Sequence, residues 1–254
     1  MSTVVPQERR QPTPLTGDRV TLLQRQLRLD ADRLSLRGGG RRLWRKHLRR
    51  LGGGPAAVAK RTIDASVAAL LLLLLSPLLL FIAAAIRLTD GGQVLFWQRR
   101  VGRWGREFDF PKFRSMCVDA EAKKAALLAQ NDHADGVTFK MKRDPRVTRV
   151  GRWLRRLSLD ELPQLWCVLK GEMSLVGPRP PVPSEVARYT LADRRRLDAV
   201  PGLTCIWQVA GRGTIPFPEQ VTMDVRYIET QSLRGDLRLL IRTVPAVIGG
   251  RGAY

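Results

Sequence analysis

A long uncharged stretch is the clearest pattern in the chain. Val67 to Ile86 is a run of 20 residues without a charged side chain, and it contains six consecutive leucines. About 20 apolar residues are needed for a helix to cross the hydrocarbon core of a bilayer. The run begins far from Met1 and no small-residue cleavage site follows it, which is not typical of a cleavable signal peptide. The pattern therefore predicts a membrane helix.

Two features favour a helix that enters the membrane, bends and returns to the same face. Ser76 and Pro77 stand at the middle of the run, and proline removes a backbone hydrogen bond from a helix. Both flanks are basic, whereas the positive-inside rule places an excess of Lys and Arg on the cytoplasmic side only. A re-entrant helix broken at Ser76-Pro77 puts both flanks on one face. A simple spanning helix is the alternative, because such helices also tolerate proline.

The rest of the chain shows short alternating segments and then helical periodicity. Gln93–Gln98 and Arg106–Phe110 alternate around a glycine-containing turn, which predicts a β-hairpin. A short strand is expected at Cys205–Val209. Helical spacing of apolar residues predicts helices at Val118–Gln130, Pro145–Arg156, Pro183–Asp198, Pro218–Glu229 and Leu233–Ile248. The expected fold class is α+β and mostly helical, with a small hairpin sheet, amphipathic helices and an N-terminal re-entrant membrane helix hairpin.

These patterns divide the chain into three parts. Residues 1–55 are rich in Arg, Gly and Pro and are expected to form a flexible basic tail. Residues 56–90 hold the membrane helix, and residues 91–254 form a folded domain. Within the tail, Arg41–Arg50 could lie on an anionic bilayer as a basic amphipathic helix. A solvated arm that binds nucleic acid is the alternative.

Composition narrows the chemistry. The formal charge is +21, from 44 Lys and Arg against 23 Asp and Glu. This excess favours a polyanionic partner, such as nucleic acid, anionic lipid or a phosphorylated substrate, without choosing among them. Only His47 and His133 occur, so His-based triads and His-rich metal sites are not expected. The three cysteines are too widely spaced for a paired zinc motif and are interpreted as reduced core thiols.

The densest chemical signal is the segment Ser158-Leu159-Asp160-Glu161-Leu162-Pro163-Gln164. Ser158 and Glu161 have the spacing of a capping box that opens a helix. Pro163 fits the first turn better if Asp160 is the cap. In both cases Asp160 lies at a helix N-terminus, and the two acids could be capping carboxylates and nothing more.

The surroundings of this acid pair favour phosphate chemistry instead. Arginine forks bind phosphate oxygens in bidentate pairs. One carboxylate can attack phosphorus, and the other can hold Mg²⁺ together with substrate phosphates. The nearby cations are Lys112 and Arg114, then Arg146, Arg149, Arg152, Arg155 and Arg156, and finally Arg179 in a proline-flanked loop.

Several segments between Lys60 and Tyr254 form an ordered series. They are Lys60-Arg61-x-x-Asp64, Ser76-Pro77, Gln98-x-Arg100-Val101-Gly102, Lys112-Phe113-Arg114-Ser115-Met116, Asp144 to Gly151, Ser158 to Gln164, Gly171 to Pro180, and Pro201-Gly202-Leu203-Thr204. This series resembles the bacterial sugar transferase family, the monotopic polyprenyl-phosphate phosphoglycosyl transferases.

The resemblance implies a re-entrant membrane helix and a Mg²⁺-dependent catalytic domain, residues 91–254, on the cytoplasmic face of the bacterial inner membrane. Asp160 would be the nucleophile that takes a sugar phosphate from a UDP-sugar and releases UMP, while Glu161 would bind the magnesium. Undecaprenyl (polyprenyl) phosphate would then attack the covalent intermediate, in the first membrane step of exopolysaccharide, capsule or O-antigen-type assembly. Lys112, Arg114, Arg155 and Arg179 are candidate phosphate or substrate contacts, and Asp224 is a candidate supporting acid.

Two residues depart from the family's pattern. Asn is common where Cys167 stands, and Gly is common where Cys205 stands. Cys205 lies in a segment, Pro201–Arg212, that could help to recognise the sugar nucleotide. The sugar therefore stays open among glucose, galactose and an N-acetylated amino sugar. Long family members carry further transmembrane helices and another domain before this core, so we expect a short form.

The expected partners are a UDP-sugar, polyprenyl phosphate and inner-membrane lipid. A membrane-tethered nucleic-acid-binding protein is the main rival, but the sequence has no helix-turn-helix, zinc-finger or RNA-binding aromatic signature. The second rival, an inactive assembly scaffold, does not explain the intact acid pair. We therefore expect no nucleic-acid partner. The oligomeric state, a homodimer included, stays open.

Overall fold

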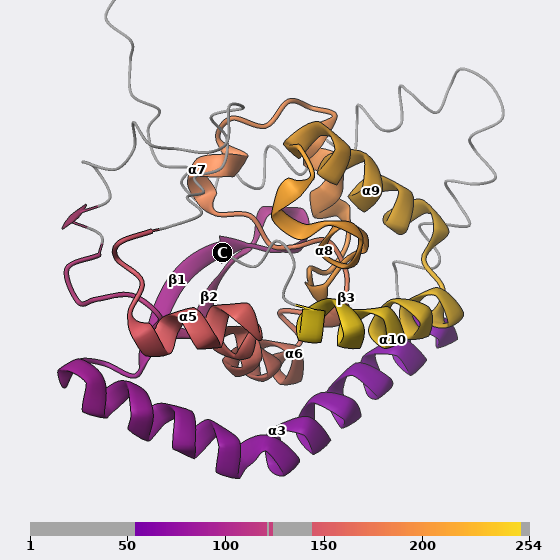
Figure 1. Ribbon diagram of the computed structural model, residues 1–254. Coiled ribbons are helices and arrows are strands. Elements are labelled where there is room, and N and C mark those ends of the chain that lie inside the picture. The colour runs from indigo at the N-terminus through magenta and orange to yellow at the C-terminus, as the bar shows by residue number, and fades with distance from the viewer. Residues whose placement is uncertain (1–53, 121, 124–143, 250–254) are drawn as a thin grey trace, which may run out of the picture. The chain divides into compact units, whose positions relative to one another are not determined.

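The described chain is mostly helical and contains two small sheets (Figure 1). The computed structural model describes residues 54–120, 122–123 and 144–249. Its elements are α3 (Pro55–Asp90), β1 (Leu95–Val101), η1 (Arg103–Gly105), β2 (Glu107–Phe113), α5 (Arg149–Arg156), η3 (Leu159–Gln164), α6 (Leu165–Lys170), β3 (Ser174–Val176), α7 (Pro183–Val186), η4 (Asp193–Asp198), β4 (Gly202–Thr204), α8 (Ile206–Ala210), η5 (Arg212–Thr214), α9 (Phe217–Thr230) and α10 (Leu233–Gly249). The η elements are 3-10 helices. The mostly helical fold, the hairpin sheet and the long apolar helix are confirmed.

Two predictions concern residues outside this description. The basic tail falls almost entirely within residues 1–53, including the amphipathic helix expected at Arg41–Arg50. Most of the helix expected at Val118–Gln130 also lies outside the described residues.

A single helix, α3, contains the whole apolar segment. Pro55 occupies its first position, where the missing N–H costs no helical hydrogen bond. Gly91 ends it with a left-handed φ of 68°, and its N–H caps the Arg87 carbonyl at 3.0 Å. The helix continues through Ser76 and Pro77, so the expected break is a bend within one helix, as Figure 1 shows.

The Ser76-Pro77 pair allows α3 to bend without leaving a carbonyl unpaired. Pro77 has no N–H, so the carbonyl of Leu73, four residues earlier, loses its usual helical donor. The Ser76 hydroxyl replaces that donor and lies 2.8 Å from the Leu73 carbonyl oxygen. This replacement matters in a bilayer, where no water can pair the freed group.

The surface of α3 is largely apolar and exposed. It is the one described helix that is long and apolar enough to cross a membrane, and only 11% of its most apolar window is buried. Its few buried positions pack on the domain. Ala68 contacts the main core around α6, while Ile82 and Ile86 pack with Phe113 and Leu154. The re-entrant course of α3 through a bilayer stays a prediction.

The predicted hairpin is formed by β1 and β2. The two strands pair antiparallel, with Gln98 opposite Phe110 and Arg100 opposite Phe108. Phe108 and Phe110 are buried on the same side of β2, because alternate residues of a strand share a face. Lys112 is the next residue on that side, and β2 packs along η3. The hairpin therefore carries Lys112 to the acid pair.

A second sheet consists of β3 and β4, which pair in parallel. Gly177, the residue after β3, touches Gly202, the first residue of β4. A Cβ atom on Gly202 would lie 2.0 Å from the backbone nitrogen of Gly177, which no side chain could tolerate. The Gly202 N–H donates to the Pro178 carbonyl at 2.9 Å, and the Gly177 N–H donates to the Thr204 carbonyl at 3.0 Å.

The strand predicted at Cys205–Val209 is wrong. The parallel ladder ends at Thr204, and α8 begins at Ile206. On the partner side β3 is followed by Gly177 and Pro178, and a proline has no N–H with which to extend a ladder. The chain after Thr204 therefore has no strand edge to pair with.

The single helix predicted at Pro183–Asp198 is also wrong. The segment forms two short helices, α7 and η4, which are separated by the non-helical residues 187–192. The Asp193 carboxylate accepts hydrogen bonds from the Thr190 N–H at 2.9 Å and from its hydroxyl at 2.7 Å. Such side-chain bonds to the local backbone compete with a continuous helix.

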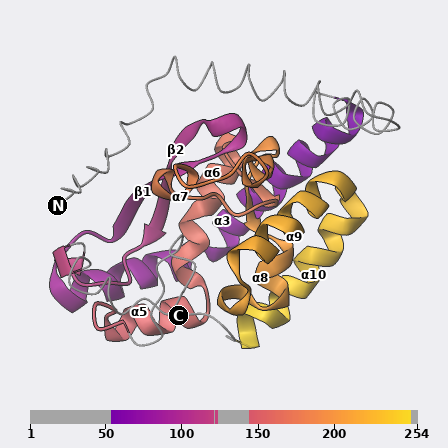
Figure 2. The ribbon, with the colours of Figure 1, turned by 90° about the horizontal axis from the view of Figure 1, so that it is seen from above.

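The other predicted helices are found with small shifts. α5 begins at Arg149 and not at Pro145, because the Thr148 hydroxyl accepts from the Gly151 N–H at 2.9 Å and caps the helix there. α9 and α10 agree with their predicted bounds to within one residue at each end. Figure 2 shows α8, α9 and α10 grouped on one side and the β1–β2 hairpin on the other.

Candidate active site

The acid pair lies on the short helix η3, which continues directly into α6. Ser158 precedes it with a left-handed φ of 54° and makes no capping hydrogen bond. Neither of the two predicted caps, from Ser158 or from Asp160, is formed among the described residues. The interpretation of Asp160 and Glu161 as capping carboxylates is therefore wrong, since neither side chain accepts a hydrogen bond from the N–H groups at the start of the helix.

Glu161 is held by two cations from distant parts of the chain. Lys112 on β2 lies 3.1 Å from Oε1, and Arg179, in the loop after β3, donates to both carboxylate oxygens at 2.7 and 3.3 Å. Burial would raise the pKa of Glu161, but Arg179 and Lys112 outweigh burial and hold this pKa well below its usual range. Glu161 is therefore ionised at neutral pH. Burial lowers the pKa of Lys112, although the charge of Glu161 opposes that shift.

Asp160 is only 8% exposed, but its hydrogen bonding differs from that of Glu161. No hydrogen bond to its carboxylate is formed by the described residues. Burial raises the pKa of Asp160, Lys112 opposes this shift, and the charge of Glu161 reinforces it. Arg155 and Arg179 also act on it electrostatically. A buried carboxylate that accepts no hydrogen bond and is surrounded by cations is suited to attack an electrophile.

Three more arginines surround the pair. Arg155 on α5 donates to the Ser115 hydroxyl at 2.9 Å and interacts electrostatically with both acids. Arg100 on β1 donates to the Pro180 carbonyl at 2.9 Å. Burial, and next the charge of Arg179, lower the pKa of Arg100 to about 10. Arg212 on η5 also interacts with Glu161 and Asp160. Lys112, Arg155 and Arg179 were predicted here, whereas Arg100 and Arg212 were missed.

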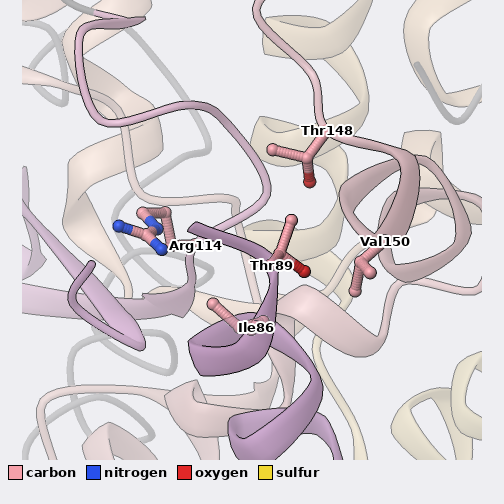
Figure 3. Close-up of a pocket in the computed structure, with 5 residues that line it drawn as sticks. All are labelled: Ile86, Thr89, Arg114, Thr148 and Val150. Atoms are coloured by element: carbon pink, nitrogen blue, oxygen red, sulfur yellow. The ribbon is translucent and has the colours of Figure 1, made fainter. Parts of the chain in front are cut away.

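Arg114 lies at a different place from the acid pair. It lines a small pocket with Ile86, Thr89, Thr148 and Val150 (Figure 3). This shallow pocket lies between the end of α3 and the start of α5. A phosphate contact by Arg114 stays a prediction.

Asp224 belongs to a separate buried cluster on α9. Its Oδ2 atom lies 2.5 Å from Arg196, whose guanidinium also donates to the Tyr189 hydroxyl at 3.0 Å. Burial raises the pKa of Asp224 to about 6, although Arg196 opposes that shift. The structure pairs Asp224 with Arg196 and not with the acid pair, so its role as a supporting acid stays a prediction.

Comparison with known proteins decides the family. The model of the family described as "Bacterial sugar transferase" matches residues 55–250, which include α3 and every residue of the site. The chain belongs to the bacterial sugar transferase family.

Known relatives of this sugar transferase differ in length. Galactosyl transferase CpsE of Streptococcus agalactiae is 46% identical over 197 residues, 77% of this chain and 43% of that protein. The exopolysaccharide production protein ExoY of Rhizobium meliloti is 42% identical over 200 residues, 78% of this chain and 88% of ExoY. The undecaprenyl-phosphate galactose phosphotransferase of Salmonella typhimurium is 44% identical over 168 residues, 65% of this chain and 35% of that protein. The chain thus spans less than half of two of these relatives and most of the third.

Two of the three cysteines are buried thiols. Cys167 and Cys205 are 1% and 2% exposed. Burial raises the pKa of Cys167 to about 12 and that of Cys205 well above its usual value, so both stay protonated at neutral pH. The prediction of core thiols is wrong for Cys117, which is only half-buried because it lies next to the exposed residues Val118 and Asp119.

Magnesium binding by the acid pair stays a prediction. Mg²⁺ in phosphoryl-transfer sites takes one or two carboxylates and completes its shell with phosphate oxygens and water. Glu161 is ionised and Asp160 is adjacent to it, but both Glu161 oxygens accept from Arg179 and one of them also from Lys112, so a magnesium ion would have to share these oxygens with the two cations. Within the described ranges no group of three His, Cys, Asp or Glu side chains could hold a metal by itself. A magnesium ion here would therefore depend on substrate phosphates for further ligands.

Proposed function

We propose that this sugar transferase moves a sugar-1-phosphate from a UDP-sugar to polyprenyl phosphate and releases UMP. The observation that carries the proposal is the buried Asp160 carboxylate, which accepts no hydrogen bond from the described residues and lies among Lys112, Arg155 and Arg179. The Salmonella relative is named an undecaprenyl-phosphate galactose phosphotransferase, which supports the same reaction type. The donor sugar of this chain is for experiment to identify.

In the first half-reaction an Asp160 oxygen attacks the phosphorus that carries the sugar. A P–O bond to the aspartate forms while the P–O bond to UMP breaks, and UMP leaves with the bonding electrons. The cations around the pair bind the phosphoryl oxygens, where charge is concentrated in the transition state. Glu161, kept ionised by Arg179 and Lys112, would hold Mg²⁺, which supplies further neutralisation of phosphate charge.

In the second half-reaction a phosphate oxygen of the polyprenyl phosphate attacks the same phosphorus. The new P–O bond forms as the bond to Asp160 breaks, which regenerates the carboxylate and yields a sugar on a polyprenyl diphosphate. Since both half-reactions use one carboxylate, UMP leaves before the lipid reacts, in a ping-pong sequence.

The exposed apolar surface of α3 supports a reaction at a membrane, where the lipid substrate resides. We infer that α3 lies in the bacterial inner membrane and that residues 91–254 face the cytoplasm. The product would enter the assembly of an exopolysaccharide or a related surface glycan. The name of the ExoY relative agrees with that place.

The test is nucleotide release by detergent-purified protein with Mg²⁺, undecaprenyl phosphate and a panel of UDP-sugars. The wild type is expected to release UMP with a preferred donor and to need the lipid for full turnover. Asp160→Asn should lower kcat by about a thousandfold or more, because the nucleophile is lost. Asp109→Asn is the matched control, since the Asp109 side chain on β2 is 60% exposed, and it should retain full turnover.

Other products would contradict the proposal. UDP release would mean transfer of the sugar alone. Full activity of Asp160→Asn would exclude the covalent intermediate at this residue. No release with any donor, together with salt-dependent DNA binding, would favour the nucleic-acid rival.

A further inference from the structure

Arg61, in the first half of α3, caps the helix that follows the acid pair. Its two Nη atoms donate to the carbonyl oxygens of Val168 and Leu169, at the C-terminal end of α6. The last carbonyls of a helix lack helical donors, and a cation at that end also suits the helix dipole. Because α6 continues directly from η3, Arg61 fixes the far end of the segment that carries the two acids.

Asp64, about one turn further along α3, fixes the strand that leads to Arg179. The Ser174 hydroxyl donates to Asp64 Oδ2 at 2.7 Å, and the Leu175 N–H donates to Oδ1 at 3.4 Å. Asp64 is 5% exposed and Ser174 is 3% exposed, so water could not replace these bonds without rearrangement. Ser174 begins β3, and Arg179 follows in the proline-flanked loop after this strand.

A buried ionic network surrounds this contact. Lys60 lies 2.6 Å from Asp236 Oδ2 on α10 and 3.6 Å from Asp64 Oδ2. The Tyr227 hydroxyl lies 2.9 Å from Asp236 Oδ1 and 2.8 Å from the carbonyl oxygen of Val176, the last residue of β3. Charged partners joined by hydrogen bonds in a low-dielectric setting hold their geometry strongly. The network therefore ties α3 to α9, α10 and β3.

We propose that Arg61 and Asp64 are positioning residues. From one turn of α3 they fix where the nucleophile Asp160 lies relative to Arg179. Arg61 holds the segment that carries Asp160, and Asp64 holds the strand that leads to Arg179. The acid-bearing segment and the loop after β3 are also joined at the active site, where Arg179 donates hydrogen bonds to Glu161. The two segments are therefore joined both at the α3 turn and at the ion pair. This inference rests on the proposed function.

Positioning residues should affect kcat more than substrate affinity. A displacement of about 1 Å at reacting groups costs on the order of a hundredfold in rate. Asp64→Asn keeps the side-chain size but removes the charge and one acceptor. We expect it to lower kcat for UMP release by about tenfold to a hundredfold while the KM for the UDP-sugar changes by less than about threefold. Arg61→Gln should act in the same direction.

Two further variants control for a non-specific effect of an Asp→Asn change and for loss of folding. Asp109→Asn makes the same chemical change at an exposed carboxylate and should leave kcat unchanged. Ser174→Ala leaves the Asp64 charge in place and removes the hydroxyl that lies 2.7 Å from Asp64 Oδ2, together with its contacts to the backbone of Val176, so it serves as the test if Asp64→Asn does not fold. Thermal unfolding in detergent confirms that each compared variant is folded.

A double-mutant cycle with Arg179→Lys distinguishes positioning from general damage. If Asp64 acts through Arg179, Asp64→Asn should cost much less in the Arg179→Lys background than in the wild type. Equal fold losses in both backgrounds would overturn the inference, as would a kcat equal to that of the Asp109→Asn control. UMP release by the wild type is measured in the same assay, so its absence would count against the proposed function itself.

Discussion

At the scale of residues, two adjacent carboxylates differ because their surroundings differ. Glu161 receives hydrogen bonds from Arg179 and Lys112, and its pKa is held low. Asp160 receives none from the described residues, and burial raises its pKa. Environments that separate the pKa values of neighbouring acids assign them different tasks. Here the ionised acid suits a cation, and the unbonded acid suits attack on phosphorus.

The raised pKa of Asp160 predicts an acid limb in the pH–rate profile. The nucleophile is the ionised form, and burial favours the protonated form, so activity should fade at a higher pH than for an exposed aspartate. We expect kcat/KM to fall with decreasing pH through a midpoint above about 4, the ordinary aspartate value. UMP release measured from about pH 4 to pH 8 tests this prediction.

The variant Lys112→Met tests the same assignment of the acid limb to Asp160. Lys112 lowers the pKa of Asp160, so its removal should move the acid limb to still higher pH. A limb that moves to lower pH in this variant would contradict the assignment of the titration to Asp160.

Sequence patterns located most of this site but not all of it. The acid pair, Lys112 and Arg179 occur in short motifs whose composition indicates phosphate chemistry. Arg100 and Arg212 could not be found in this way. Arg100 reaches the pair through the register of a hairpin, and Arg212 follows a helix that was predicted as a strand.

At the scale of elements, α3 shows how a proline is accommodated in a helix without an unpaired carbonyl. Ser76 and Pro77 act as a unit, in which one residue removes a donor and the other replaces it. The pair therefore permits a bend at low cost in hydrogen bonding. A bend of this kind is what a helix needs if both of its ends are to lie on one face of a membrane.

Pro77→Ala should favour a spanning course over a re-entrant one. The alanine N–H can pair with the Leu73 carbonyl, so the cause of the bend disappears. In sealed inner-membrane vesicles, protease should reach both ends of the wild-type α3 from the cytoplasmic side. In the variant we expect a share of molecules with ends on opposite sides, and lower turnover. Wild-type ends on opposite faces would refute the re-entrant prediction.

Elements with strong local periodicity were predictable, and those fixed by distant pairing or by a local side-chain bond were not. The β1–β2 hairpin, α9 and α10 follow from alternation or helical spacing within each segment. The limit of β4 depends on β3, whose ladder stops at Gly177-Pro178. The split between α7 and η4 depends on a side-chain bond from Asp193 that apolar periodicity does not reveal.

At the scale of the whole molecule, the described part has two apolar helical surfaces. α3 exposes much of its length, and α10 exposes Leu237, Ile241 and Val244 by 59%, 63% and 59%. These three residues share one face of α10, beside the exposed Arg238 and Arg242. An apolar face flanked by arginines is typical of a helix at the interface of an anionic bilayer.

This surface predicts direct lipid contact by α10. A photoreactive amino acid at position 237 should crosslink to phospholipid acyl chains in reconstituted vesicles. The matched control is position 222, where Thr222 is exposed on α9 without apolar neighbours of the same kind. Mass spectrometry of the adducts measures the outcome. Equal lipid crosslinking at both positions, or none at 237, would contradict the prediction.

The contact between Gly177 and Gly202 limits how this scaffold can be rebuilt. The loop that carries Arg179 and the turn that starts β4 fit only because neither has a side chain at the point where they touch. If only one of the two loops were replaced by that of another family member, its backbone would no longer match the loop that it touches here. Chimeras made to change sugar preference should therefore exchange residues 171–180 and 201–212 together, as one cassette.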